Sequence, residues 1–143
     1  MCKEPRPMNL EVPGKPAPWQ AQMRRAERSP GFLRMQAWQD VIRIYARQAM
    51  GSREPSAGPI ELEFVFYLAW PKSGPKMQGP AGLRYAEKQI LKKPDVSNLN
   101  KAAEDALKGI IFVDDSQVIK VSGEKTFAYD VPEGWVSIGI EGD

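Results

Sequence analysis

Carboxylates and lysines gather in residues 92–117, in an order that suits chemistry on a phosphate ester. The segment reads K-K-P-D-V-S-N-L-N-K-A-A-E-D-A-L-K-G-I-I-F-V-D-D-S-Q. Asp95 follows a proline, and Asp114 and Asp115 stand side by side near the end. Carboxylates hold hard divalent cations and lysines bind phosphate, and metal-assisted cleavage of a phosphodiester needs both. The segment therefore indicates a metal-dependent site that acts on a phosphodiester.

The same residues also have ordinary structural uses. Asp-Asp pairs are common in turns, where their side chains accept hydrogen bonds from nearby backbone N–H groups. Lys101 and Asp105 are four residues apart and can form an ion pair on a helix surface. From these residues alone, a metal site is the less favoured of the two interpretations.

The absence of histidine narrows the chemistry further. It excludes Ser-His-Asp and Cys-His nucleophile systems, as well as His-ligated zinc or haem. A metal must be bound through oxygen, which favours Mg²⁺, Mn²⁺ or Ca²⁺. The single cysteine, Cys2, forms no internal disulfide, which suits a reducing cytosol, and we expect a cytoplasmic location.

Charge is unevenly distributed although the net value is only +2. Lys and Arg outnumber Asp and Glu by ten to four in residues 1–53 and by seven to two in residues 70–101, whereas residues 102–143 carry three against nine. A basic surface beside an acidic pocket suits nucleic acid and a metal, and solvated surface charge is the plain alternative. We expect no membrane association, because the chain has neither a long apolar run nor a signal peptide.

The length and the hydrophobic pattern predict one domain, residues 1–143. The predicted class is α/β (α+β in the looser sense), with a small mixed sheet of about four strands and two main helices. Alternating residues predict an edge strand at 8–13, strands at 60–68, 117–128 and 134–141, and a short strand at 110–113. Gly123 is expected to form a bulge in the third of these.

The first helix is predicted over residues 33–50 and the second from Ser97 onward, with the Ser97 hydroxyl as its cap. A Pro/Gly-rich loop over 71–82 and one short helix over 85–91 are expected between them. The expected core residues of the first helix are Leu33, Ala37, Val41, Ile44, Tyr45 and Gln48, with Trp38 and Ile42 beside them. Those of the second are Leu99, Ala102, Ala103, Ala106, Leu107 and Ile110, with Asn98, Lys101 and Asp105 on another face.

The acids are expected at the ends of neighbouring elements. Pro94 disfavours helix at Lys93, so the chain before Asp95 is predicted to be extended. Asp114 and Asp115 follow the short apolar strand. Carboxylates in such places can converge on one metal.

The segment resembles the RusA family of Holliday-junction resolvases. The family signature is roughly K-P-D-x-D-N-L-x-K, then a helix with D-A-L near its end, then D-D-x-Q. This chain has K-P-D-V-S-N-L-N-K, E-D-A-L-K-G and D-D-S-Q-V in the same order and spacing. The motifs cover about a fifth of the chain, and the agreement elsewhere is looser: an opening strand, then G-K-P-x-P, a helix, and G-P-I-E-L.

The resemblance implies a role for each matching residue. Asp95 and Asp115 correspond to metal-binding acids of the catalytic site, with Asp114 in support. Lys101 corresponds to a catalytic lysine that stabilises charge on the phosphate. The expected DNA contacts are Lys92, Lys93, Asn98, Arg24, Arg25, Lys72 and Lys76. The resemblance also implies Mg²⁺ (or Mn²⁺) as cofactor, branched DNA with four-way junctions as substrate, and a homodimer that makes two symmetric nicks.

Ser97 departs from the family pattern, which most often has a second aspartate there. In one interpretation the site still cleaves, and Ser97 caps the helix or binds a metal-bound water. In the other, the protein binds branched DNA and cuts it poorly or not at all. Asp105 either supplies the missing charge or is structural, and a scaffold domain whose acids only cap and turn ranks below both.

Tryptophans offer a further contact with DNA. Trp19 and Trp70 lie beside Pro-rich loops, where stacking on an exposed base and ordinary packing are equally good interpretations. Trp38 lies on the apolar side of the first helix and is expected in the core.

Overall fold

A four-stranded mixed sheet with the order β1-β4-β2-β3 forms the centre of the molecule. The strands β1 (Met8–Pro13) and β2 (Ile60–Ala69) pair antiparallel with β4 (Trp135–Gly142), and β3 (Val118–Ala128) pairs parallel with β2. The sheet confirms the predicted α+β class, the four strands and the edge position of the first strand. The computed structural model describes residues 8–19, 29–72, 74–75, 79–128, 131 and 133–142.

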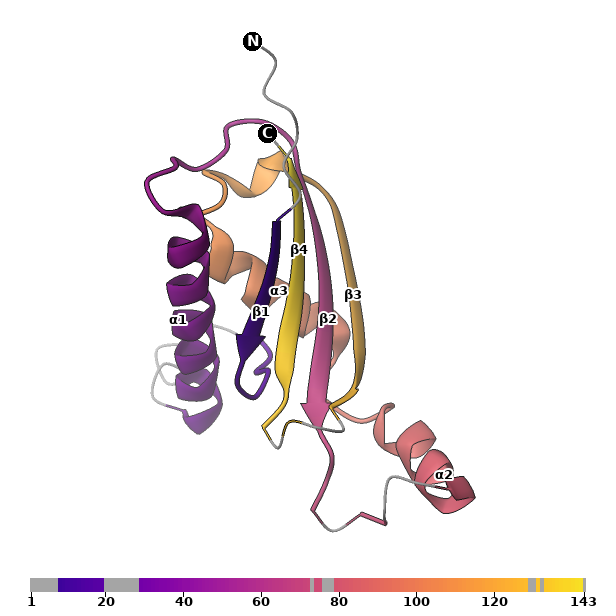
Figure 1. Cartoon of the computed structure of the whole chain (residues 1–143). Coiled ribbons are helices and arrows are strands. Elements are labelled where there is room, and N and C mark those ends of the chain that lie inside the picture. Colours follow the sequence, from indigo (N-terminus) through magenta and orange to yellow (C-terminus); the bar gives the residue numbers. More distant parts are fainter. Residues whose placement is uncertain are drawn as a thin grey trace.

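The core lies between the sheet and two helices, α1 (Pro30–Met50) and α3 (Val96–Leu107), which cover the same face of the sheet (Figure 1). Every second side chain of β2 is buried there: Ile60, Leu62, Phe64 and Phe66. The predicted stripe of α3 is also buried from Leu99 to Leu107, whereas Ile110 lies beyond the end of that helix. The alternation that predicted β2 therefore reports burial on one face.

The core-facing side of α1 differs from the predicted one. Its buried residues are Phe32, Met35, Trp38, Gln39, Ile42 and Ala46, whereas Leu33 and Ile44 are 53% and 51% exposed. Apolar residues stand on more than one side of this helix, so spacing alone allowed two faces. The side that carries Phe32, Met35 and Trp38 removes more apolar surface from water. The prediction that Trp38 is a core residue is confirmed.

A third helix, α2 (Gly79–Gln89), projects from the end of the sheet where β2 finishes (Figure 1). It starts within the stretch predicted as a loop and ends two residues before the predicted helix does. Pro80 is its second residue, where a missing backbone N–H leaves no helical hydrogen bond unmade. The short helix predicted between the two main helices is therefore confirmed, and it begins earlier than expected.

Residues 110–113 form a tight turn, and the strand predicted there is wrong. Gly109 has a φ of 87°, and its N–H donates to Phe112 O at 2.7 Å. The N–H groups of Ile110 and Ile111 both donate to Leu107 O, which curls the chain back on the end of α3. The apolar run was misleading because Ile111 and Phe112 are buried in the core without belonging to a strand.

Gly123 pairs regularly with Phe64, and the irregularity between β2 and β3 lies instead at Ile60 and Glu61. The bulge predicted at Gly123 is therefore wrong. The glycine has another reason: a Cβ at this position would overlap the side-chain amide of Asn100. The absence of a side chain lets α3 pass close over β3.

Candidate active site

Asp95 is the N-cap residue of α3, in an extended conformation with φ −76° and ψ 140°. Its backbone O accepts from Leu99 N–H at 3.1 Å, but its side chain makes no capping hydrogen bond. Ser97 lies in the first turn and is exposed, so the cap predicted there falls two residues earlier. The Asp95 carboxylate is exposed and has no hydrogen bond or ion pair with the described part of the chain.

The chain that leads to Asp95 is held by a lysine on the edge strand. Residues 92–94 bend, where an extended segment was predicted, and the Lys93–Pro94 peptide is cis. Lys125 of β3 reaches this bend, and its Nζ donates to Lys92 O at 2.8 Å and to Pro94 O at 3.1 Å. Lys125 therefore fixes the position of Asp95, although no pattern in the sequence pointed to it.

Lys101 lies over the ring of Trp19, with its Nζ 3.6 Å from the ring centroid. Contacts of this kind attract a cation to the negative face of the indole. Trp19 is itself tied to α3, because its backbone N–H donates to Asn98 O at 2.9 Å. The linker after β1 and the first turns of α3 therefore form one unit around Lys101.

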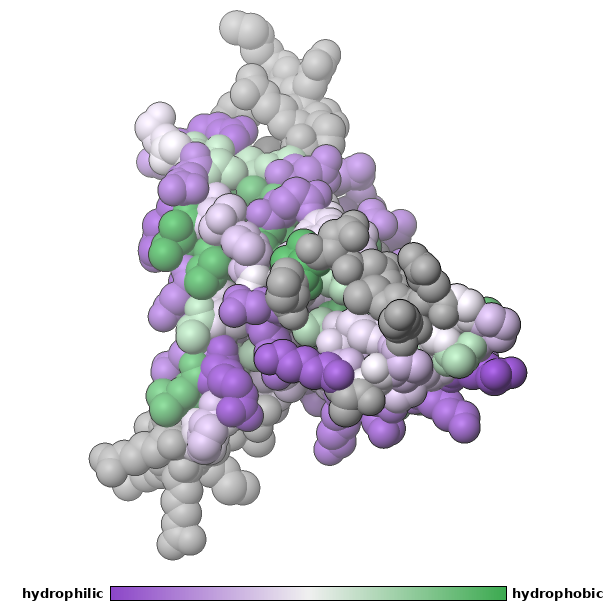
Figure 2. All heavy atoms as spheres, turned by 60° about the horizontal axis from the view of Figure 1, so that its bottom comes forward, coloured by the Kyte–Doolittle hydropathy of each residue, from purple (hydrophilic) through white to green (hydrophobic). Residues whose placement is uncertain are grey.

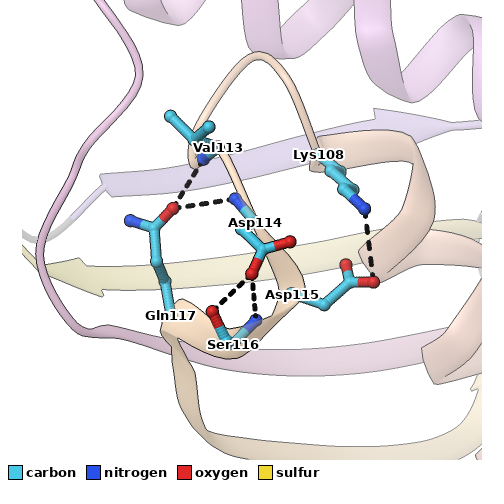
Figure 3. A network of polar contacts seen from close by, with 6 residues as sticks. All are labelled: Lys108, Val113, Asp114, Asp115, Ser116 and Gln117. Carbon is cyan, nitrogen blue, oxygen red and sulfur yellow. Dashed lines mark hydrogen bonds and ion pairs between the residues drawn. The ribbon is translucent and has the colours of Figure 1, made fainter.

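The two adjacent aspartates lie at the other end of α3 and point in different directions (Figure 3). Asp114 is the N-cap of a short 3-10 helix, η2 (Asp115–Gln117), and accepts hydrogen bonds from Ser116 N–H at 3.4 Å and from the Ser116 hydroxyl. These bonds hold the pKa of Asp114 below its ordinary value. The turn interpretation of the pair is thus confirmed for Asp114.

Gln117 joins this turn to a loop that is distant in sequence. Its side-chain oxygen accepts from Val113 N–H and Asp114 N–H, both at 2.8 Å (Figure 3). Its side-chain nitrogen donates to Ser56 O at 2.7 Å and to Gly58 O at 2.9 Å. The glutamine of the D-D-S-Q motif is therefore a four-bond structural clamp, and sequence reasoning missed it.

Asp115 turns toward the end of α3, where its carboxylate is 3.4 Å from Lys108 Nζ (Figure 3). Both side chains are largely exposed, so the pair contributes little to stability. Burial, followed by repulsion from Asp115 and Asp105, raises the pKa of Glu104. Burial and then Asp115 also raise the pKa of Asp105, against the opposing charges of Lys101, Lys108 and Arg43. This end of the helix is a crowded acidic surface.

The predicted metal ligands do not come together within one chain. A helix of twelve residues is about 18 Å long, and Asp95 lies at its start whereas Asp114 and Asp115 lie past its end. Among the described residues there is no group of three acids placed to hold a metal ion. The acids present in one protomer therefore do not fit the three-carboxylate Mg²⁺ site that the motif led us to expect.

Of the four expected DNA contacts that the structure describes, three are exposed lysines and the fourth, Asn98, is partly buried. Lys92 and Lys93 precede Asp95, and Lys72 follows β2. Hydrophilic residues cover much of the end of the molecule that Figure 2 brings forward. Arg24, Arg25 and Lys76 lie outside the described residues.

Trp70 and the described helices bear on two further expectations. The Trp70 ring packs against Tyr85 and Phe127, at centroid distances of 5.5 and 5.1 Å, and its Nε1–H donates to Pro75 O. These contacts favour ordinary packing over base stacking at Trp70.

None of the helices in the described ranges has the length and apolar character needed to cross a membrane.

Comparisons with known proteins bear on the family of the chain. A family model described as "Endodeoxyribonuclease RusA" matches residues 13–139, which include both ends of α3. The chain is also 35% identical, over 74 residues, to YqaN of Bacillus subtilis (strain 168), which is described as an uncharacterized protein. That match spans 50% of this chain and 51% of YqaN.

Proposed function

The chain belongs to the RusA endodeoxyribonuclease family, and on this premise we propose that it is a structure-specific endodeoxyribonuclease that resolves four-way DNA junctions. The observation that carries the proposal is the arrangement at the start of α3. There Asp95, an exposed carboxylate without a partner among the described residues, lies within two helical turns of Lys101, whose side chain is oriented by Trp19. Exposed cations surround both groups.

Each group at this end has a distinct part in the proposed reaction. Lys101 is about 9 Å further along the helix axis than Asp95, and its ammonium stabilises the charge that develops on the phosphate. Its contact with Trp19 limits the positions that the long side chain samples. Lys92 and Lys93 hold the DNA backbone through charge, which makes affinity depend on salt more than on sequence.

The proposal includes a homodimer with sites shared between subunits. Asp95 of one subunit and Asp115 of the partner subunit then form each site, because the two acids of a single chain are separated by the length of α3. Such a shared site offers the oxygen ligands that Mg²⁺ or Mn²⁺ prefers. A four-way junction has two-fold symmetry, and a two-fold dimer presents two equivalent sites for two symmetric nicks.

A nicking assay on a synthetic four-way junction tests the activity. We expect paired nicks with Mg²⁺ and none with EDTA, and at least a hundredfold loss in Asp95→Asn and in Lys101→Met. Asp40→Asn is the matched control, because Asp40 is an exposed aspartate on α1 whose pairing with Arg43 is on the surface. The melting temperature of Asp95→Asn should equal that of the wild type. Full activity in Asp95→Asn would contradict the assignment.

Mixing two inactive variants tests the shared site. Asp95→Asn and Asp115→Asn subunits, mixed in equal amounts and allowed to exchange, would restore about a quarter of the sites, because half the dimers are mixed and each has one intact site. These dimers would make single nicks. No recovery, with subunit exchange verified by mass spectrometry, would mean that each site is built from one chain.

Ser97 supports a second candidate, a branched-DNA-binding protein that does not cut. It is an exposed neutral residue two positions after Asp95, where the family pattern has an acid. This candidate predicts junction binding without nicks in Mg²⁺ and the appearance of nicks in Ser97→Asp. If Ser97→Asp and the wild type cut equally well, the serine is a tolerated variation.

A further inference from the structure

A cavity of about 650 Å³ opens beside Asp95, between the linker after β1, the helix α1 and the start of α3. Residues 13–19 form one wall, Arg34, Ala37 and Trp38 belong to the second, and Lys93 and Asp95 to the third. Binding sites for small molecules have volumes of roughly 300 to 1,000 Å³. The cavity is therefore large enough to hold one nucleotide.

The walls of the cavity are held in place by contacts between elements. The linker is fixed at its start by the Gly14 N–H, which donates to Gly134 O at 3.2 Å, and at its end by Trp19 N–H, which donates to Asn98 O at 2.9 Å. Lys125 of β3 holds the bend before Asp95, because its Nζ donates to the carbonyls of Lys92 and Pro94. A ligand would therefore enter a site that is already formed.

The charge of the lining favours an anion. Lys15, Arg34 and Lys93 line the cavity, and Asp95 is the single carboxylate among the described residues of its lining. Each of the three cations belongs to a different wall of the cavity. Cations that converge on one hollow raise the local concentration of anionic ligands.

Apart from Asn98, the rest of the described lining is glycine, aromatic or apolar. Trp19 and Trp38 both contribute to it, together with several prolines of the linker. Trp38 is only 3% exposed and forms a buried part of the wall, whereas the Trp19 ring is partly exposed. Aromatic rings are surfaces on which bases stack.

We propose that this cavity receives one unpaired nucleotide of a DNA strand, with its phosphate among Lys15, Arg34 and Lys93 and its base against Trp19 and the prolines. The inference rests on the proposed function and deepens it, because it names the feature of branched DNA that the enzyme reads. A phosphate alone would leave the aromatic wall unused, and an apolar peptide would leave three cations without partners.

The cavity also explains how an unpaired nucleotide would direct cleavage. Asp95 belongs to its lining, and Lys101 lies on the ring of Trp19, another lining residue. A nucleotide seated there would bring its neighbouring phosphodiester to these two groups. Fully paired duplex offers no free nucleotide, and a four-way junction offers one where a base pair opens at the branch point, so the cavity would favour strands that open there.

The inference is tested by the binding of a fluorescein-labelled single strand of about eight nucleotides. Fluorescence anisotropy measures the affinity, and EDTA prevents cleavage. Ala37→Trp fills the cavity from an exposed helix position, and we expect it to weaken binding at least tenfold. Gln48→Trp places the same side chain at an exposed position of α1 outside the cavity and should bind as the wild type does. Circular dichroism of both variants verifies the fold. Equal affinity of Ala37→Trp and wild type would overturn the proposal.

A charge variant gives a second readout that does not depend on bulk. Lys15→Gln should lower the slope of log affinity against log salt by about 0.7, the value for one phosphate contact on a single strand. Lys120→Gln removes an exposed lysine of β3 outside the lining and serves as its control. An unchanged slope in Lys15→Gln would show that Lys15 does not contact a phosphate.

The junction assay separates this inference from the proposed function. If the wild type nicks junctions in Mg²⁺ and Ala37→Trp binds the single strand normally, the cavity proposal fails alone. If the wild type makes no nicks but its single-strand binding is lost in Ala37→Trp, the cavity stands and the nuclease fails. If the wild type makes no nicks and Ala37→Trp binds the single strand normally, the cavity proposal and the nuclease proposal both fail.

Discussion

The two ends of α3 carry similar acids in opposite circumstances. At the start, the Asp95 side chain has no partner within the described residues and borders a cavity lined by three cations. Past the end, Asp114 caps a turn, and Asp115 faces Lys108 at 3.4 Å. A carboxylate without internal bonds is free to act on a ligand, whereas one that caps a turn is occupied by its own fold.

The contrast divides one sequence motif into two tasks. The K-P-D part carries the exposed carboxylate of the proposed site, and the D-D-S-Q part mainly builds the turn that follows the other end of the helix. Asp115 lies between these cases, because the contact of its side chain within the described residues is an exposed pair that solvent screens. In the proposed dimer it is therefore the acid of the second part that serves the shared site.

The largest effect that would sharpen this contrast is expected at Gln117. Gln117→Leu removes four hydrogen bonds to backbone groups, and we expect a loss of about 2–3 kcal/mol in the free energy of unfolding. Urea denaturation measures this loss. Gln48→Leu, at an exposed position of α1, is the control, and its free energy of unfolding should change by less than about 0.5 kcal/mol. A loss no larger than that of the control would mean that the clamp is not structural.

A smaller effect, on activity, is expected at Lys125. Lys125→Met keeps the length of the stem but loses both bonds to the bend before Asp95. We expect nicking to fall about tenfold, because small displacements of a catalytic group are costly, and the free energy of unfolding to fall by about 1 kcal/mol. Lys120→Met on the same strand should alter neither. Normal nicking in Lys125→Met would show that Asp95 needs no support from β3.

The smallest effect concerns pH and the acidic end. The pKa of Asp105 is raised above 3.8 by burial and by Asp115, so its protonated form favours the folded state. The charged form lowers stability at neutral pH, and this penalty disappears as pH falls through the raised pKa. Asp105→Asn should therefore stabilise the protein at pH 7, by less than about 1 kcal/mol because the group is half-exposed.

Thermal unfolding at several pH values would follow that gain, which should vanish below about pH 4. Asp40→Asn gives the general effect of removing an exposed carboxylate from a helix. A gain that persists in acid would point to a cause other than charge.

Local patterns predicted the elements well where one face is buried. The alternation of β2 and the apolar stripe of α3 each report a single buried side, and both were confirmed. The stripe of α1 was wrong because this helix has apolar residues on several sides, and the run at 110–113 was wrong because buried turns can be as apolar as strands.

The supports of the candidate site were beyond the reach of the sequence for a different reason. Lys125 contacts residues 31 and 33 positions away, and Gln117 contacts residues 59 and 61 positions away. Neither contact leaves a periodic trace. The separation of Asp95 from Asp115 was in principle foreseeable, because a twelve-residue helix between them sets their distance.

The strand order β1-β4-β2-β3 also bears on how the chain is made. The strand that joins β1 to β2 is β4, the last of the four to leave the ribosome. Until then, β1 has no neighbour in the sheet, and the linker that carries Trp19 is not tied to Gly134. A nascent chain therefore holds α3 and both ends of the motif well before it can close the cavity, and premature termination before Trp135 would release a protein without a central strand.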